Sequence, residues 1–306
     1  MGRYIAKRLL GVIPVMIGVI VIVYTITYYL PGAPPIPAVK AAALGLNKPY
    51  PVQLGAYIWK LISKLDLGKS YLTNIPVTME LAIRIPITFK LSMLCIFLML
   101  AVGLPCGMIS ALRQYSALDV SLTSLSLITS AIPGFILALI SAVFFGVTLK
   151  WLPVTGLDSW KSWIQPVFCS AMSGVAIYIR MTRTAMLEVI RQDYIRSAKA
   201  KGMRDITVVR KHALRNCMIP LATVTGISVA AVLSGSIIVE TIFSIPGMGL
   251  YLMDGILSRD YPVINGSVVV ISLLVCFVNL FVDVIYAFID PRVRTQFISP
   301  TKIPKI

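Results

Sequence analysis

The segment Tyr178–Pro220 reads YIRMTRTAMLEVIRQDYIRSAKAKGMRDITVVRKHALRNCMIP and separates two long apolar runs. From residue 180 to residue 215 it carries ten Lys or Arg and three acidic residues, a net charge of +7. Lys and Arg resist transfer across a membrane, so a basic excess of this size between apolar runs is typical of a cytoplasmic loop. This loop therefore fixes which ends of the neighbouring helices face the cytoplasm.

The same loop predicts two short helices. Residues 192–201 are expected to form the first and residues 205–214 the second, with Gly202 between them. Asp205 is a candidate N-cap for the second helix, which has apolar residues at helical spacing. A basic loop with helices of its own is interpreted as a docking surface for another protein.

The composition of the whole chain is that of a membrane protein. Its 306 residues are 58% hydrophobic and 13% charged, with a mean hydropathy of +0.87. A soluble domain with this balance would expose apolar surface and aggregate, so we expect an all-α polytopic membrane protein. The formal charge of +16 does not indicate nucleic-acid binding, because ten of the 28 basic residues lie in one loop between spans.

The apolar runs predict six transmembrane helices. The first run has 22 residues, which is longer than a signal-peptide core and close to the roughly 20 residues that a span needs. Both termini are basic, so we expect both in the cytoplasm, and PGAPPIP (Pro31–Pro37) ends the first helix on the outside. The expected spans are 9–30, 87–112, 120–149, 164–182, 219–243 and 263–289.

Four regions follow from these spans. Residues 1–30 hold the cytoplasmic N-terminus and the first span, and residues 31–86 form an extracytoplasmic segment. Residues 87–290 form a five-helix core that includes the cytoplasmic loop at 183–218. Residues 291–306 form a basic cytoplasmic tail.

Two unusual features lie inside the expected spans. IPGF (Ile132–Phe135) interrupts the third span, and such a break is either a packing kink or part of a pathway. In the last span a polar stripe follows one helical face and should contact other helices, because polar groups facing lipid are unfavourable. We favour a packing and gating network, and the alternative is a proton-carrying Asp283. The stripe is Asn279, Asp283, Tyr286 and Asp290.

The sequence contains no recognisable catalytic, cofactor-binding or metal-binding set. Its five cysteines form no CxxC pair and lie mostly in or beside apolar runs, which favours buried hydrophobes over disulfide or metal chemistry. His212 is the only histidine. LGKS (Leu67–Ser70) looks like half of a phosphate-binding loop, but the full pattern needs Gly where Ser63 stands, and no strand precedes it.

Several motifs together resemble one family. YIRSAKAKG (Tyr194–Gly202), then RKHALRN and Pro220, resembles the cytoplasmic "EAA" loop of ABC-importer permeases of the dipeptide/oligopeptide/nickel branch. In that family the loop forms a coupling helix that sits in a groove of the ATPase subunit. The resemblance covers nearly the whole chain, from YIAKRLLGVIPV near the start through PGMG and RDYP to DPR near the end.

The match to the loop motif is incomplete. Arg196, Ser197 and Ala198 occupy the Glu-Ala-Ala places and Gly202 the Gly place, so a contact that needs the Glu carboxylate is not carried over. If the first helix continues to Gly202, Ala198 and Gly202 share a face with almost no side chain, which a partner can approach closely. The ATPase-docking residues that the resemblance implies are Tyr194, Arg196, Ala198, Lys199, Lys201, Gly202, His212 and Arg215.

The resemblance implies the type I ABC-importer permease fold and a place in a larger assembly in the cell membrane. This chain resembles the first of two related permeases, with two ATPase subunits below and an extracytoplasmic binding protein above. ATP and Mg would bind to the ATPases, so this chain is expected to bind no cofactor and not to be an enzyme. Peptides are the expected substrate, and nickel or other metal chelates and glutathione stay open as alternatives.

Two other function classes fit less well. A stand-alone secondary transporter would usually show internal repeats, and none is visible. A membrane enzyme would need a nucleophile and base, or a metal set, inside the membrane.

Overall fold

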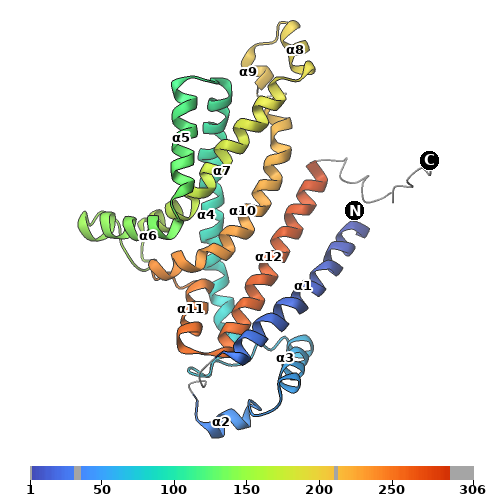
Figure 1. Ribbon diagram of the computed structural model, residues 1–306, viewed down its shortest axis with the longest axis vertical. Coiled ribbons are helices and arrows are strands. Elements are labelled where there is room, and N and C mark those ends of the chain that lie inside the picture. The colour runs from blue at the N-terminus through green and yellow to red at the C-terminus, as the bar shows by residue number, and fades with distance from the viewer. Residues whose placement is uncertain (1, 31–35, 210–212, 290–306) are drawn as a thin grey trace, which may run out of the picture.

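The computed structural model describes residues 2–30, 36–209 and 213–289, and within these ranges the chain is helical. The one β feature there is an isolated bridge between Lys69 and Pro76. Figure 1 shows long helices running between two ends of the molecule, with α8 and α9 at one end and α2, α3 and α11 at the other. The expected all-α polytopic fold is confirmed.

Five described helices are long and apolar enough to cross a membrane. A sixth crossing would be the pair α5 (Ala117–Ala131) and α6 (Gly134–Ser141) with the π-helical turn η1 (Ala142–Thr148), which is bent by 91°. Ile132 is extended and Pro133 has no backbone N–H, so the helix cannot continue through IPGF. The five are α1 (Gly2–Tyr29), α4 (Val77–Leu112), α7 (Ile164–Ile190), α10 (Leu214–Ile242) and α12 (Tyr261–Ile289).

Helix α4 begins ten residues before the expected start at Ile87. In its first turns Glu80 and Arg84 form an i, i+4 ion pair at 2.9 Å on the helix surface. Pro86 lies inside the helix and does not end it. The segment 77–86 therefore belongs to the helix, where the sequence predicted part of a mixed extracytoplasmic region.

Helix α7 extends eight residues beyond the expected end at Thr182, and α10 begins at Leu214. The loop expected at 183–218 therefore shrinks to residues 191–213. Inside it lie two short helices, α8 (Asp193–Ala200) and α9 (Asp205–Val208). Asp205 is the first residue of α9, and its side chain lies outside the described part.

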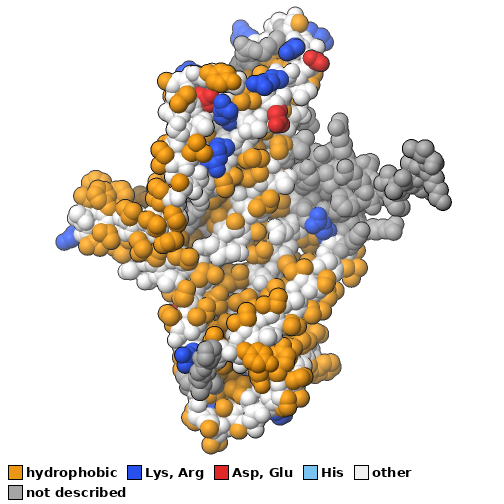
Figure 2. Space-filling model, viewed as in Figure 1, with side chains coloured by type: hydrophobic (Ala, Val, Ile, Leu, Met, Phe, Trp, Pro, Cys, Tyr) orange, Lys and Arg blue, Asp and Glu red, His pale blue; other side chains and the backbone are white. Residues whose placement is uncertain are grey.

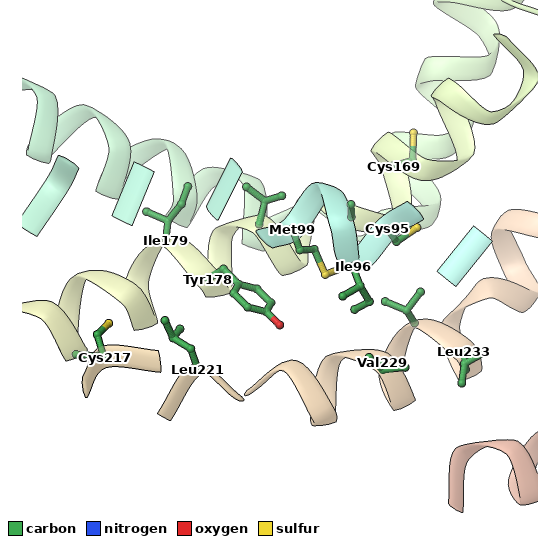
Figure 3. Close-up of a cluster of buried hydrophobic side chains, with 14 of the residues drawn as sticks. Cys95, Ile96, Met99, Cys169, Tyr178, Ile179, Cys217, Leu221, Val229 and Leu233 are labelled. Carbon is green, nitrogen blue, oxygen red and sulfur yellow. The ribbon is translucent and has the colours of Figure 1, made fainter. Parts of the chain in front are cut away.

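The core is centred on α7, which packs against α4, α5, α6 and α10. Two glycines allow α4 to approach it closely: a Cβ on Gly103 would collide with Tyr178 Cβ, and one on Gly107 would lie 2.6 Å from Thr182 Cβ. Figure 3 shows Tyr178 pointing between α4 and α10 in the cluster of buried side chains. Its hydroxyl hydrogen-bonds Thr225 on α10 at 2.8 Å.

Three shorter helices lie at the opposite end from α8 (Figure 1). Helices α2 (Ala38–Ala43) and α3 (Tyr50–Lys64) follow α1, and α11 (Met248–Ser258) follows α10. A short 3-10 turn, η2 (Trp160–Trp163), leads into α7. The α8–α9 loop lies at its own end beside the turn between α4 and α5 (Figure 1).

Candidate functional site

The basic loop is attached to the helices beneath it by a small apolar face. Ile195 and Ala198 of α8 are 1% and 9% exposed, and Val208 of α9 is 1% exposed. All three belong to the same buried cluster as Met186 of α7 and Ala213 at the start of α10. Apolar residues three apart on α8 thus turn toward the bundle, and the rest of the helix faces outward.

The face that Ala198 and Gly202 were expected to share does not form. Helix α8 ends at Ala200, and Gly202 follows with φ +76°. The Met203 amide donates to the Ala198 carbonyl at 3.4 Å, the bond that closes a helix around a left-handed glycine. Ala198 is buried against the bundle in the single chain, and its docking role stays a prediction. Gly202 is exposed and ends the helix.

The outward face of α8 is polar and open. Tyr194 is 43% exposed, and its hydroxyl accepts a hydrogen bond from Asn216 Nδ2 at 2.9 Å. Arg196 approaches Asp193 at 4.0 Å, with both side chains largely in solvent, a geometry that contributes little to stability. Lys201 is also exposed. The side chains of Lys199 and Arg215, and all of His212, lie outside the described part of the chain.

Basic side chains gather at this end of the molecule. Figure 2 shows most of the Lys and Arg on the visible face around α8 and α9 and the adjoining ends of α5 and α7, with hydrophobic side chains over much of the remaining described surface. The charge is consistent with the cytoplasmic location expected from the sequence.

A buried ion pair lies beneath the loop, and the sequence analysis missed it. Arg183 of α7 donates to Asp119 of α5 through Nε at 2.7 Å and Nη2 at 2.8 Å, and Asp119 is 3% exposed. The Ser110 hydroxyl and the Tyr115 amide also donate to this carboxylate. Ser116 caps α5 by accepting from the Asp119 amide. The pair therefore fixes the turn between α4 and α5 against α7.

A second missed site lies at the outer end, where α10 meets α11. Glu240 is fully buried, and its carboxylate accepts from the Gly249 amide at 2.7 Å and the Leu250 amide at 3.2 Å. It also accepts from the Thr88 hydroxyl of α4 at 2.7 Å, and that hydroxyl in turn accepts from the Met248 amide. The carboxylate thus satisfies free N–H groups at the start of α11, where a negative charge is favourable.

The glycines of PGMG are required by this packing. A Cβ on Gly247 would collide with Glu240 Oε2, and one on Gly249 would lie 2.5 Å from the Ile237 Cα. A side chain at position 249 would press on the backbone of α10, and one at position 247 would displace the Glu240 carboxylate. The motif is therefore a structural element that seats α11 on Glu240.

A third buried carboxylate ties the extracytoplasmic segment to RDYP. Asp260 is 2% exposed and accepts from the Ser70 hydroxyl at 2.6 Å and from the Tyr71 amide at 3.0 Å. Burial, with smaller contributions from nearby groups that include Asp260, raises the pKa of Tyr71 above its ordinary value. Ser70 is the last residue of LGKS, so its hydroxyl serves a turn and not a phosphate site.

Only part of the polar stripe of α12 lies within the described part of the chain. Asn279 is exposed in the single chain, so no described helix covers it. The side chains of Asp283 and Tyr286 and all of Asp290 lie outside the described part. The described residues hold no cluster of three or more metal-ligating side chains. The role of the stripe stays a prediction.

Comparison with known proteins gives a family and several relatives. Residues 103–295 match the family model described as "Binding-protein-dependent transport system inner membrane component". A putative peptide transport system permease protein of Brucella abortus (strain 2308) is 36% identical over 313 residues, which cover 96% of this chain and 99% of that protein. A glutathione transport system permease protein of Pectobacterium atrosepticum is 37% identical over 305 residues, with coverage of 96% and 99%.

A dipeptide transport system permease protein of Alkalihalophilus pseudofirmus is 36% identical over 333 residues, covering 96% of this chain and all of that protein (100%). Among solved structures, an inward-facing MetNI methionine ABC transporter matches with a TM-score of 0.61 and 20% identity. The match covers 70% of this chain and 97% of the other. At this identity the likeness shows the fold alone, and it confirms the expected permease fold.

Proposed function

The chain belongs to the family of inner membrane components of binding-protein-dependent transport systems, and we propose that it is the first of two permeases in an ATP-driven importer of peptides. The observation that carries the proposal is similarity over 96% of the chain to permeases named for peptide and dipeptide transport. The relative named for glutathione transport is equally similar, so glutathione, itself a small peptide, is the second candidate. Metal chelates have no comparable support among these relatives.

The α8–α9 loop is the proposed contact with an ATPase subunit. Its outward face is exposed, whereas Ile195 and Ala198 hold its inner face against the bundle. Val208 and Ala213 are buried in the same cluster as Met186. A displacement of α8 is therefore transmitted directly to the adjoining ends of α7 and α10. This attachment supports a coupling role, in which movement of an ATPase shifts two membrane helices.

The same geometry supports the proposed orientation in the cell membrane. The N-terminal end of α1 and the C-terminal end of α12 point away from α2 and α3, toward the side of the basic loop (Figure 1). We propose that these two helix ends face the cytoplasm, with α2, α3 and α11 outside, where a binding protein would deliver substrate. A second permease would complete the path, and ATP and Mg would bind to the two ATPases.

The docking assignment is tested at Ser197, which is exposed on the outward face of α8. Ser197→Trp places a bulky side chain in the contact without disturbing the buried Ile195 and Ala198. We expect normal membrane insertion and loss of ATPase subunits from the complex purified through a tag on this chain. Ser63→Trp, the same change at an exposed site on α3, is the matched control. Full ATPase recovery and uptake in Ser197→Trp would contradict the assignment.

A further inference from the structure

Arg180 places a charged side chain deep inside a membrane span. It lies ten residues before α7 ends at Ile190, which is about 15 Å at 1.5 Å per residue. Its two partners on α5, Ser126 and Ser130, lie nine and thirteen residues after that helix begins at Ala117. The hydrocarbon core of a bilayer is about 30 Å thick, so the guanidinium lies about half a bilayer thickness from the ends of α5 and α7 that face the basic loop.

The guanidinium of Arg180 donates its hydrogen bonds through one nitrogen, Nη1, in the described part of the chain. Its Nη1 donates to the Ser126 carbonyl at 3.1 Å and to the Ser130 hydroxyl at 3.1 Å. In the ranges that the structure describes, no carboxylate pairs with Arg180, and its Nε and Nη2 make no hydrogen bond there. Arg183, one turn further along the same helix, has both Nε and Nη2 engaged by Asp119. Among the described residues, a carboxylate pairs with Arg183 and none pairs with Arg180.

Arg180 lies on the face of α7 whose other residues are exposed in the single chain. It is half-buried, and the residues around it on that side are exposed and of mixed polarity. Glu188 is eight residues away, about 12 Å along the helix axis, which is too far for an ion pair. A charge facing lipid at this depth is strongly unfavourable, so this side must face protein or water. The exposed residues of this side are Ser173, Ile177, Met181, Thr184 and Glu188.

We propose that Arg180 lies on the translocation path and binds the carboxylate of the peptide substrate, an inference that rests on the proposed function. A guanidinium presents two parallel N–H groups to a carboxylate, and the two serines of α5 hold this one in place before the substrate arrives. A peptide that crosses the membrane brings its C-terminal carboxylate through a region of low dielectric, where an unpaired charge is unfavourable. Arg180 supplies the missing counter-charge at this depth.

The test compares two peptides in two complexes. Initial ATP-driven uptake of trialanine and of its C-terminal amide is measured in proteoliposomes with saturating binding protein, for the wild type and for Arg180→Gln. Any preference of the binding protein is the same in both complexes and cancels from the ratio of the two rates. We expect Arg180→Gln to lower the preference for the free carboxylate by about tenfold, as loss of a charge-assisted hydrogen bond implies.

Two further variants complete the test. Met181→Gln adds the same amide at the next exposed position and should leave the ratio unchanged, whereas Arg180→Lys should keep part of the preference. An unchanged ratio in a transporting Arg180→Gln complex overturns the proposal. Loss of the second permease from the purified Arg180→Gln complex also overturns it, because Arg180 would then pair with that subunit. If the wild type transports neither peptide with ATP, the proposed function itself fails and this inference with it.

Discussion

The α8–α9 loop and the segments at the opposite end of the molecule are built in different ways. At the outer end, Glu240 and Asp260 are buried and accept hydrogen bonds from backbone amides of other segments. At the other end, the α8–α9 loop carries many charges, yet its described ion pair, Arg196 with Asp193, is open to solvent at 4.0 Å. The outer segments are thus fixed by the chain itself, whereas the loop is attached by a few apolar side chains and leaves its polar face free.

This difference indicates which part of the chain contacts a partner protein. Buried, fully hydrogen-bonded carboxylates specify one arrangement, and removing one of their partners is strongly destabilising. An exposed ion pair contributes about 0–1 kcal/mol and fixes little. We infer that the outer segments keep their arrangement within the single chain, and we propose that the outward face of α8 acquires its final contacts from an ATPase. Three substitutions test this contrast.

The largest effect is expected at Glu240. Glu240→Ala removes the acceptor oxygen that both the Gly249 and the Leu250 amide use and leaves the two amides without that partner. We expect a loss of about 2–5 kcal/mol in the free energy of unfolding, measured by thermal unfolding in detergent. Glu188→Ala, at an exposed site on α7, is the control and should have little effect. If the two variants are equally stable, the buried Glu240 carboxylate does not stabilise the fold more than an exposed one does.

An intermediate effect is expected at the Asp119–Arg183 pair. Asp119→Asn removes the charge that Arg183 faces and should destabilise by about 1.5–3 kcal/mol, less than at Glu240 because the Arg183 side chain is 24% exposed. In a double-mutant cycle, Arg183→Met should cause little further loss when it is added to the Asp119→Asn variant. Independent, additive losses would show that the pair does not hold α5 to α7.

The smallest effect is expected at Gly202. Its φ of +76° is tolerated by Asn and is strained for a β-branched residue. Gly202→Asn should leave stability and ATPase recovery near the wild type, whereas Gly202→Val should lower loop stability by about 1–2 kcal/mol, read from amide hydrogen exchange in α8. If Gly202→Asn alone removes the ATPase, Gly202 contacts the partner directly and is more than a helix terminator.

The sequence predicted features that depend on local pattern. Hydropathy located the spans, and the charge of the basic loop separated it from them. The second span was expected to begin at Ile87, whereas α4 begins at Val77 and continues through Pro86. These are errors of boundary, and the fold class does not depend on them.

Features that depend on distant partners could not be predicted in the same way. The hydrogen bond between Thr88 and Glu240 joins residues 152 positions apart, and that between Ser70 and Asp260 joins residues 190 apart. Ala198 was expected on the docking face, but tertiary packing turns it inward. A single sequence shows the helical periodicity of α8, and it does not show which side faces the bundle.

We propose that this chain works only as part of an ATP-driven complex. The decisive measurement is peptide uptake by proteoliposomes that contain the complex purified through a tag on this chain, with binding protein outside. We expect uptake that requires ATP and Mg inside and continues when ionophores collapse all ion gradients. Uptake by the purified chain alone, driven by an ion gradient and indifferent to ATP, would contradict it.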